Sequence, residues 1–322
     1  MNEISAFRLH SVGQPPCILR VNRPVPGPGE VGVRVAACGL NFADLLVSKG
    51  KYQIKPSLPT TLGMELSGTV EAVGTGVTTY AHGQRIAAYC GFGGLAEYAA
   101  VPANRCVPIP DAMTFIEAAG FLVAYGTSHL ALGHKARLTA GETLLVLGAA
   151  SGVGLTAVEI GKLMGARVIA CARGPEKLEA AKAAGADHLV DALSQDIKET
   201  VKALGGADVA YDPVGGKQFT DALGAMRPGG RIMAIGFASG EVPQIPANHL
   251  LVKNVDVLGF WWGGYAEFAP DVMTESLSAL MRWYEAGKLR PKIAHTLPLD
   301  RAADAFDLLR SRGAPGKIVV TT

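Results

Sequence analysis

The sequence predicts an α/β fold in two parts, a doubly wound parallel sheet and a β-rich domain. Between about residues 124 and 263, helical and strand patterns alternate strictly, as in parallel sheets built from β-α-β units. Before about residue 120, short β-branched runs are bounded by clusters of Pro and Gly, which is typical of antiparallel strands and tight turns. The 322 residues are also enough for two domains.

The β-rich domain is expected to span residues 1–123 and to be completed by residues 264–322. The C-terminal stretch is too short for a domain of its own. The expected strands are Ile18–Val21, Glu30–Ala37, Leu66–Val73, Leu95–Val101, Arg105–Ile109 and Lys317–Thr321, and the expected helices are Asn41–Gly50, Pro270–Ala286 and Leu299–Ser311.

The second domain is expected to span residues 124–263. A largely helical stretch, Phe115–Leu132, leads into it. The expected strands are Thr143–Leu147, Arg167–Ala172, His188–Val190, Val209–Tyr211, Arg231–Ile235 and Val255–Phe260, and the first two helices between them are Val153–Met164 and Glu176–Ala184.

Composition excludes several classes of function. The 30 basic and 28 acidic residues are interspersed and give a net charge of +2, so no nucleic-acid partner is expected. No apolar run approaches the length of a membrane helix, and the N-terminal residues lack the pattern of a signal peptide. The five cysteines are odd in number and include no C-x-x-C pair. These features predict a soluble, cytoplasmic protein with reduced thiols and no membrane partner.

The strongest motif is a strand, a small-residue turn, a helix and a second strand over Thr143–Arg173, with GAASGVG at Gly148–Gly154 as the turn. Small side chains let backbone N–H groups approach a pyrophosphate, and the helix N-terminus adds partial positive charge. The fit to G-x-G-x-x-G is imperfect, because Ala149 and Ser151 stand at the first two glycine positions. The context still predicts a dinucleotide site that uses Ser151, Gly152 and Val153.

The end of the second strand of this motif indicates which dinucleotide binds. NAD sites carry Asp or Glu there, whereas this chain has Arg173, with Lys177 four residues later. Two cations without a carboxylate suit a 2′-phosphate, so the expected cofactor is NADPH. The alternative is that both are ordinary solvated charges, with Glu176 available to pair with either.

The segment CGLNFADLL, Cys38–Leu46, resembles a metal or thiol site at first sight. None of the seven histidines lies at ligand spacing from a cysteine, so no metal site is expected. No neighbouring base is evident for Cys38, which favours a buried structural thiol.

Four motifs together carry a resemblance to a known family: CGLNFAD (Cys38–Asp44), LGMELSGTVEAVGTGV (Leu62–Val77), LTAGETLLVLGAASGVG (Leu138–Gly154) and GKIVV (Gly316–Val320). They resemble the zinc-free quinone oxidoreductase, or ζ-crystallin-like, branch of the medium-chain dehydrogenase/reductase superfamily. The resemblance implies a Rossmann domain and a GroES-like catalytic domain. It also implies metal-free hydride transfer, because Asn41 and Met64 stand where zinc-containing members carry a ligand Cys and a ligand His.

The resemblance implies an NADPH-dependent homodimer that acts on a quinone or a conjugated carbonyl. Tyr52 would be either the proton donor or part of the cleft wall, and Asn41 would contact the substrate or the nicotinamide. Further cofactor contacts implied by motif are Thr127, Gly236, Phe237, Phe260 and Lys317, the last of these near the adenosine phosphate.

The aromatic run FWWGGY, Phe260–Tyr265, has two interpretations. Trp261 and Trp262 are expected in the core or at a subunit interface, with a flat wall for a quinone ring as the alternative. Two other functions stay open: an enone or enoyl-thioester reductase on the same scaffold, and a non-catalytic NADPH-binding protein.

Overall fold

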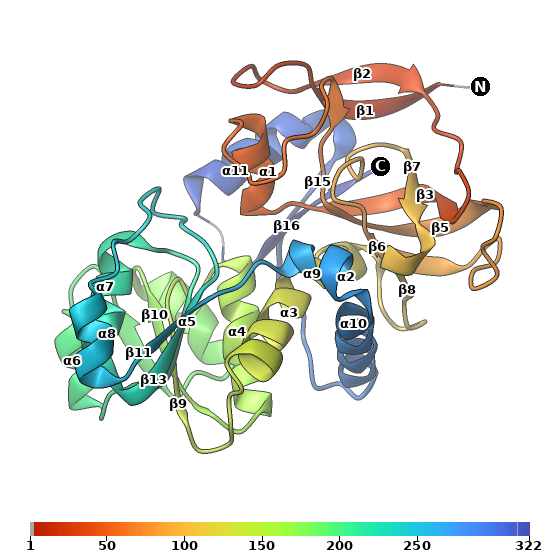
Figure 1. Cartoon of the computed structure of the whole chain (residues 1–322). Helices are drawn as coiled ribbons and strands as arrows, with labels where there is room; N and C mark the ends of the chain where they lie inside the picture. Colours follow the sequence, from red (N-terminus) through yellow and green to blue (C-terminus); the bar gives the residue numbers. More distant parts are fainter. Residues whose placement is uncertain (1–2, 314) are drawn as a thin grey trace. The chain divides into compact units, whose positions relative to one another are not determined.

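The computed structural model describes residues 3–313 and 315–322. The chain divides into two compact units (Figure 1). The first unit comprises residues up to Val123 together with Tyr265–Thr322, and the second comprises Ala124–Gly264. Two helices, α3 (Leu122–His129) and α9 (Trp262–Phe268), run across these divisions in the sequence.

The first unit contains two sheets. A small antiparallel sheet has the order β2-β1-β4, and a larger sheet has the order β15-β16-β3-β5-β6-β8, with β7 paired to β3. The strands are β1 (Glu3–Leu9), β2 (Cys17–Asn22), β3 (Glu30–Gly39), β4 (Thr60–Thr61), β5 (Glu65–Val73), β6 (Arg85–Tyr89), β7 (Tyr98–Pro102), β8 (Cys106–Pro108), β15 (Ile293–Pro298) and β16 (Lys317–Thr321).

Strand β3 is the centre of the larger sheet, because it pairs with both an early and a late segment of the chain. Gly39 at its end lies opposite Glu65 of β5 and opposite Val319 of β16. Valines that alternate along β3 are buried against Leu66, Val70 and Ile86 of the neighbouring strands. This register brings the start of β5 and the start of β16 to the same end of β3.

The helices of the first unit are α1 (Phe42–Ser48), α2 (Phe115–Ala119), α10 (Pro270–Glu285) and α11 (Ala302–Ser311), with 3₁₀ turns at Ala103–Arg105 and Leu299–Arg301. The predicted helical stretch Phe115–Leu132 is not continuous. Helix α2 begins at a capping box between Thr114 and Glu117 and ends at Gly120. A new helix, α3, then starts at Leu122 and passes into a π-helical turn over Leu130–Lys135.

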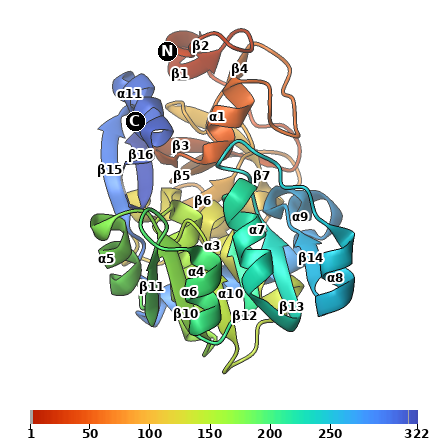
Figure 2. The same cartoon turned by 90° about the vertical axis from the view of Figure 1, so that its left-hand side faces the viewer.

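The second unit is a six-stranded parallel sheet with the order β11-β10-β9-β12-β13-β14, the arrangement of a doubly wound dinucleotide-binding fold (Figure 2). Its strands are β9 (Thr143–Val146), β10 (Arg167–Ala172), β11 (His188–Asp191), β12 (Ala207–Asp212), β13 (Met226–Ala234) and β14 (Asp256–Gly259). The chain order reverses between β9 and β12, and the carboxyl ends of these two strands are where such folds bind ligands.

The helices of the second unit connect successive parallel strands. They are α4 (Gly152–Leu163), α5 (Pro175–Ala183), α6 (Ile197–Ala203), α7 (Gly216–Ala225) and α8 (Ala247–Lys253). Helix α4 packs on β9 and β10, and α7 packs on β12 and β13. The core combines apolar residues of both layers, such as Leu145, Ile169 and Phe219. Strand β13 begins at Met226, five residues before the predicted start, and its pairing with β12 shifts register between Met226 and Arg231.

Candidate functional site

A buried polar cluster lies where β3 ends and α1 begins. Asn41 is the N-cap of α1, and its backbone N–H donates to Asp44 Oδ2 at 2.8 Å. Asp44 Oδ1 also accepts from the N–H of Gly63 at 3.2 Å. The Asp44 carboxyl group is 1% exposed, and this burial raises its pKa to about 7 against the opposing effect of the two hydrogen bonds.

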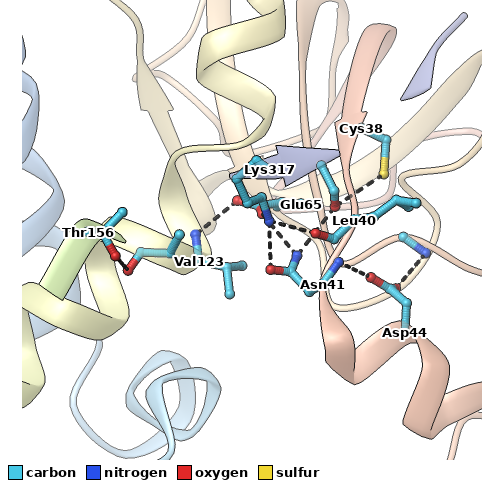
Figure 3. Close-up of polar contacts among 11 residues, drawn as sticks. Cys38, Leu40, Asn41, Asp44, Glu65, Val123, Thr156 and Lys317 are labelled. Atoms are coloured by element: carbon cyan, nitrogen blue, oxygen red, sulfur yellow. Dashed lines mark hydrogen bonds and ion pairs between the residues drawn. The ribbon is translucent and has the colours of Figure 1, made fainter. Parts of the chain in front are cut away.

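Three side chains from distant segments meet beside this turn (Figure 3). Glu65 Oε1 accepts from Lys317 Nζ at 2.8 Å and from Asn41 Nδ2 at 2.9 Å. Lys317 Nζ also donates to the Leu40 carbonyl at 2.7 Å and to Asn41 Oδ1 at 2.8 Å. Glu65 and Lys317 form an ion pair with side-chain exposures of 0% and 8%.

The orientation of the Asn41 amide is fixed by these partners. An ammonium group only donates and a carboxylate only accepts, so Oδ1 must face Lys317 and Nδ2 must face Glu65. The second Nδ2 hydrogen has an acceptor in the Gly39 carbonyl at 3.3 Å. Both amide hydrogens that were candidates for binding a substrate or nicotinamide are therefore directed into the cluster.

Lys317 has a different environment from the one that its motif implied. Its ammonium group has three donors, and the Leu40 carbonyl, Asn41 and Glu65 supply three acceptors within 2.8 Å. A phosphate contact would require at least one of these bonds to break in the interior of the first unit. The geometry therefore supports a structural role for Lys317 and gives no support to a contact with an adenosine phosphate.

The thiols of this region are buried. Cys38 is 0% exposed, and burial raises its pKa well above the usual range, as it also does for the pKa of Cys90. Both groups are therefore protonated thiols and poor nucleophiles at neutral pH. Among residues 3–313 and 315–322, no group of three or more His, Cys, Asp or Glu side chains is placed to hold a metal ion.

Tyr52 lies in the irregular segment after α1 and is half-buried. It is close enough to Tyr89, at the end of β6, to help raise the pKa of that phenol, although burial of Tyr89 is the larger cause.

The turn between β9 and α4 has the geometry of a phosphate cradle. Gly154 has no room for a side chain, because a Cβ atom there would lie 2.2 Å from the Gly148 carbonyl oxygen. Ser151 caps α4, and its hydroxyl accepts from the N–H of Gly154 at 3.1 Å. The amides of Gly152 and Val153 lie in the first helical turn, where N–H groups have no acceptor within the helix.

The end of β10 carries the two predicted cations. Arg173 is exposed and Lys177, on α5, is half-buried. A carboxylate that sequence reasoning did not connect with this turn, Asp191 at the end of β11, accepts from the N–H of Gly174 at 3.0 Å. Asp191 also accepts from the Leu193 N–H and the Ser194 hydroxyl, and the backbone hydrogen bonds lower its pKa.

A second carboxylate that the sequence did not single out lies at the carboxyl end of β12. Asp212 is 1% exposed and accepts from the N–H groups of Val214 and Gly215 at 2.7 and 2.9 Å. Burial raises its pKa to about 6. The signal that could have revealed it is the strand-terminal position in YDPVGG, next to the β9 turn in the sheet.

The remaining predicted contacts lie in the second unit. Gly236 and Phe237 follow β13, and the Phe237 side chain is 40% exposed. Thr127 on α3 is 6% exposed. The adjacent Ser128 belongs to a buried hydroxyl network with Thr156, which is drawn in Figure 3, and Tyr211.

The two tryptophans of FWWGGY differ. Trp262 is 3% exposed and packs against α3, since a Cβ atom on Gly126 would lie 2.6 Å from its indole nitrogen. Trp261 is 36% exposed, and Phe260 is buried. Trp262 is therefore a core residue of the second unit, whereas Trp261 retains exposed ring surface.

Family models match both units. The alcohol dehydrogenase GroES-like domain matches residues 27–111, and the zinc-binding dehydrogenase domain matches residues 152–278.

Whole-chain relatives also match. The quinone oxidoreductase-like protein 2 homolog of Nematostella vectensis is 40% identical over 92% of this chain and 82% of its own. The human synaptic vesicle membrane protein VAT-1 homolog is 32% identical over 92% of this chain and 80% of its own. The quinone oxidoreductase of Thermus thermophilus, solved also in complex with NADPH, is 36% identical, with a TM-score of 0.88 over 99% of this chain and 100% of that one.

No helix within the described part of the chain has both the length and the apolar character needed to cross a membrane.

Proposed function

The chain belongs to the zinc-free quinone oxidoreductase branch of the medium-chain dehydrogenase/reductase superfamily, and on that premise we propose that it is an NADPH-dependent quinone reductase. The observation that carries the proposal is that side chains other than metal ligands stand at the two positions where zinc-containing members carry a ligand Cys and a ligand His. These side chains are Asn41 and Met64. The buried cation beside Asn41 is the ammonium group of Lys317.

The residues of the β9–α4 turn fit a dinucleotide. The cradle excludes side chains at Gly154, and the first-turn amides of Gly152 and Val153 are suited to a pyrophosphate. Arg173 and Lys177 would bind the 2′-phosphate. The nearby Asp191 carboxylate already accepts three hydrogen bonds, one from the N–H of Gly174 in the turn after β10 and two from Leu193 and Ser194 in its own turn.

Substrate choice follows from the lack of a Lewis acid among the proposed catalytic groups. An unactivated alcohol or ketone needs strong stabilisation of a developing alkoxide. A quinone or conjugated carbonyl spreads that charge over a π-system, so one hydrogen-bond donor is enough. Bound NADPH would supply a hydride from its nicotinamide C4, and a proton then completes reduction of a quinone to a hydroquinone.

Tyr52 is the donor that we assign to the acceptor's oxygen. It is half-buried beside a second phenol, Tyr89, whereas both amide hydrogens of Asn41 are directed into the buried cluster. Asn41 would therefore shape the site and would not donate to the substrate. Trp261, with its exposed ring surface, is the proposed wall for a planar substrate, and Trp262 is not.

We also propose that the protein is a cytoplasmic homodimer that forms along β14. Within the described residues, β14 pairs on one side only, with β13. The helix before it exposes Leu251 and Val252, at 78% and 75%. Light scattering should give twice the chain mass, and Leu251→Asp should lower it to that of a monomer.

The five free thiols fit a reducing compartment.

The test of the activity is NADPH oxidation with a panel of acceptors: 1,4-benzoquinone, 9,10-phenanthrenequinone, an alkenal and crotonyl-CoA. The proposal predicts turnover with the quinones. Turnover with crotonyl-CoA alone would identify an enoyl-thioester reductase. Saturable NADPH binding without turnover of any acceptor would identify a non-catalytic binding protein.

A further inference from the structure

Glu65 is a fully buried carboxylate that reaches a segment far along the chain. Its Oε1 atom binds Lys317 and Asn41, and its Oε2 atom accepts from the backbone N–H of Val123 at 2.9 Å (Figure 3). Val123 is the second residue of α3, so its N–H has no acceptor within the helix. Glu65 therefore supplies an acceptor to the first turn of α3, where the helix dipole also favours a negative charge.

The surrounding sequence keeps this contact close. A Cβ atom on Gly39 would lie 2.1 Å from the Ala119 carbonyl oxygen and 3.0 Å from Glu65 Oε1. Only glycine at this position of β3 allows the segment before α3 to approach the strand so closely. Lys317 supplies the opposite charge that a buried carboxylate requires. The carboxylate, its counter-charge and the glycine thus form one anchor for the start of α3.

Thr127 lies four residues after Val123 in the same helix, and residues at this spacing share one helical face. We infer that Glu65 is a positioning residue: by binding the Val123 amide it fixes the first turn of α3 and, through it, the Thr127 hydroxyl that would contact the nicotinamide. This inference rests on the proposed function as an NADPH-dependent reductase and on the cofactor contact that the family resemblance implies for Thr127.

A double-mutant cycle tests the inference. Glu65→Asp keeps the charge but shortens the reach to Val123, and Thr127→Val removes the hydroxyl at nearly constant volume. NADPH affinity is measured by nicotinamide fluorescence without an acceptor. Each single variant should raise the Kd on the order of tenfold, as expected for one lost charge-assisted hydrogen bond, and the double variant no more than the larger single effect.

Glu71→Asp is the matched control, because Glu71 is a carboxylate of the same strand that pairs with Arg23 and Arg34. It should leave the Kd unchanged. Independent effects of Glu65→Asp and Thr127→Val, whose free energies simply add, would overturn the inference. So would an unchanged Kd in Glu65→Asp.

Amide hydrogen exchange of the cofactor-free protein gives a second readout. Exchange of the first turn of α3 should be faster in Glu65→Asp and unchanged in Thr127→Val and Glu71→Asp. Unaltered exchange in Glu65→Asp refutes the anchor. If Glu65→Asp does not fold, Lys317→Arg, which keeps the charge and changes the geometry, replaces it in both measurements. If the wild-type chain binds no NADPH, the proposed function fails, and exchange alone decides whether Glu65 anchors α3.

Discussion

The side chain of Arg173 is expected to determine whether the protein prefers NADPH or NADH. It is exposed at the end of β10, next to Gly174, which is the N-cap of α5. A guanidinium group binds phosphate oxygens through fixed pairs of donors, whereas it gains little from ribose hydroxyls. The Asp191 carboxylate accepts hydrogen bonds from the N–H of Gly174 in this turn, from the N–H of Leu193 and from the Ser194 hydroxyl.

Arg173→Ala should therefore weaken NADPH far more than NADH, by roughly ten- to a hundredfold, because the lost bonds go to a charged phosphate. Fluorescence titration with each cofactor measures this. Lys182→Ala, in the last turn of the same helix, is the control and should change neither affinity. Equal losses for the two cofactors would contradict NADPH preference.

Asp44 makes stability depend on pH. Burial raises its pKa to about 7, against about 3.9 in an unfolded chain. The folded state therefore holds this proton more tightly, and the stabilisation present below about pH 4 is lost as the pH rises through about 7. The free energy of unfolding of the wild type, minus that of Asp44→Asn, should fall between about pH 4 and about pH 7, by at most about 1.4 kcal/mol per pH unit, and should level off at higher pH.

Urea unfolding of both proteins at several pH values measures this difference. Asp44→Asn loses one of the two backbone acceptor sites, so it should be less stable than wild type by a further amount that does not depend on pH. A difference that stays flat between about pH 5 and about pH 7 would contradict the raised pKa, because it would show that Asp44 is already ionised in the folded state.

The β9–α4 turn is the element on which cofactor binding depends. The steric constraint on this turn is local. A Cβ atom added to Gly154 would lie within 2.9 Å of backbone atoms of Gly148 and Ala149. Backbone cannot move aside as a long side chain can. The turn and the helix must therefore separate if a methyl group is added.

Gly154→Ala should lower the free energy of unfolding by about 1–3 kcal/mol and remove measurable NADPH binding. Gly224→Ala in α7 is the matched control. The three atoms nearest to its Cβ would all belong to the flexible side chain of Lys198, the first at 2.8 Å, and alanine favours a helix by up to about 1 kcal/mol. Thermal unfolding and NADPH titration compare the two variants. Equal losses of stability and of NADPH affinity would show that Gly154 has no special steric role in the turn.

Many helices and strands were predictable from the sequence, because hydrophobic periodicity and the Gly and Pro residues that bound each element are local signals. The bounds of β10 and β16 are those predicted, Arg167–Ala172 and Lys317–Thr321. Strands β1, β4, β6 and β15 were missed: β4 has two residues, β6 is short and alanine-rich, and β15 is largely exposed. Such strands are set by pairing with distant partners, and sequence patterning carries no such information.

The site was predictable only in part, for the same reason. The turn at Gly148–Gly154 is contiguous and was visible in the sequence. The partners of Asn41 were not: Glu65 and Lys317 stand 24 and 276 positions away, and only the register of β3, β5 and β16 unites them. A lysine near the C-terminus gives no sign of burial until that register is known.

The buried cluster joins early and late parts of the chain at the scale of the whole molecule. Its members come from the β3–α1 turn, β5, β16 and the start of α3, and β16 closes the sheet that β3 begins. A buried ion pair adds little net stability compared with apolar residues, yet loss of one partner leaves a costly buried charge.

Lys317→Met should therefore destabilise the protein by about 3–5 kcal/mol, because the buried carboxyl group of Glu65 would lose its ion-pair partner. The double variant Glu65→Gln/Lys317→Met should recover much of that loss. Denaturant unfolding of the three proteins gives the comparison, and a double variant no more stable than Lys317→Met would argue against the ion pair as the source of the effect.

By the proposed function, this chain transfers hydride from NADPH to a quinone without a metal ion. The most direct measurement is the rate of NADPH oxidation by 1,4-benzoquinone with protein stripped of metal by chelation and dialysis. Stripped protein should retain the full rate, and added Zn²⁺ should not increase it. Loss of activity on stripping, with recovery on addition of Zn²⁺, would show instead that hydride transfer depends on a metal ion.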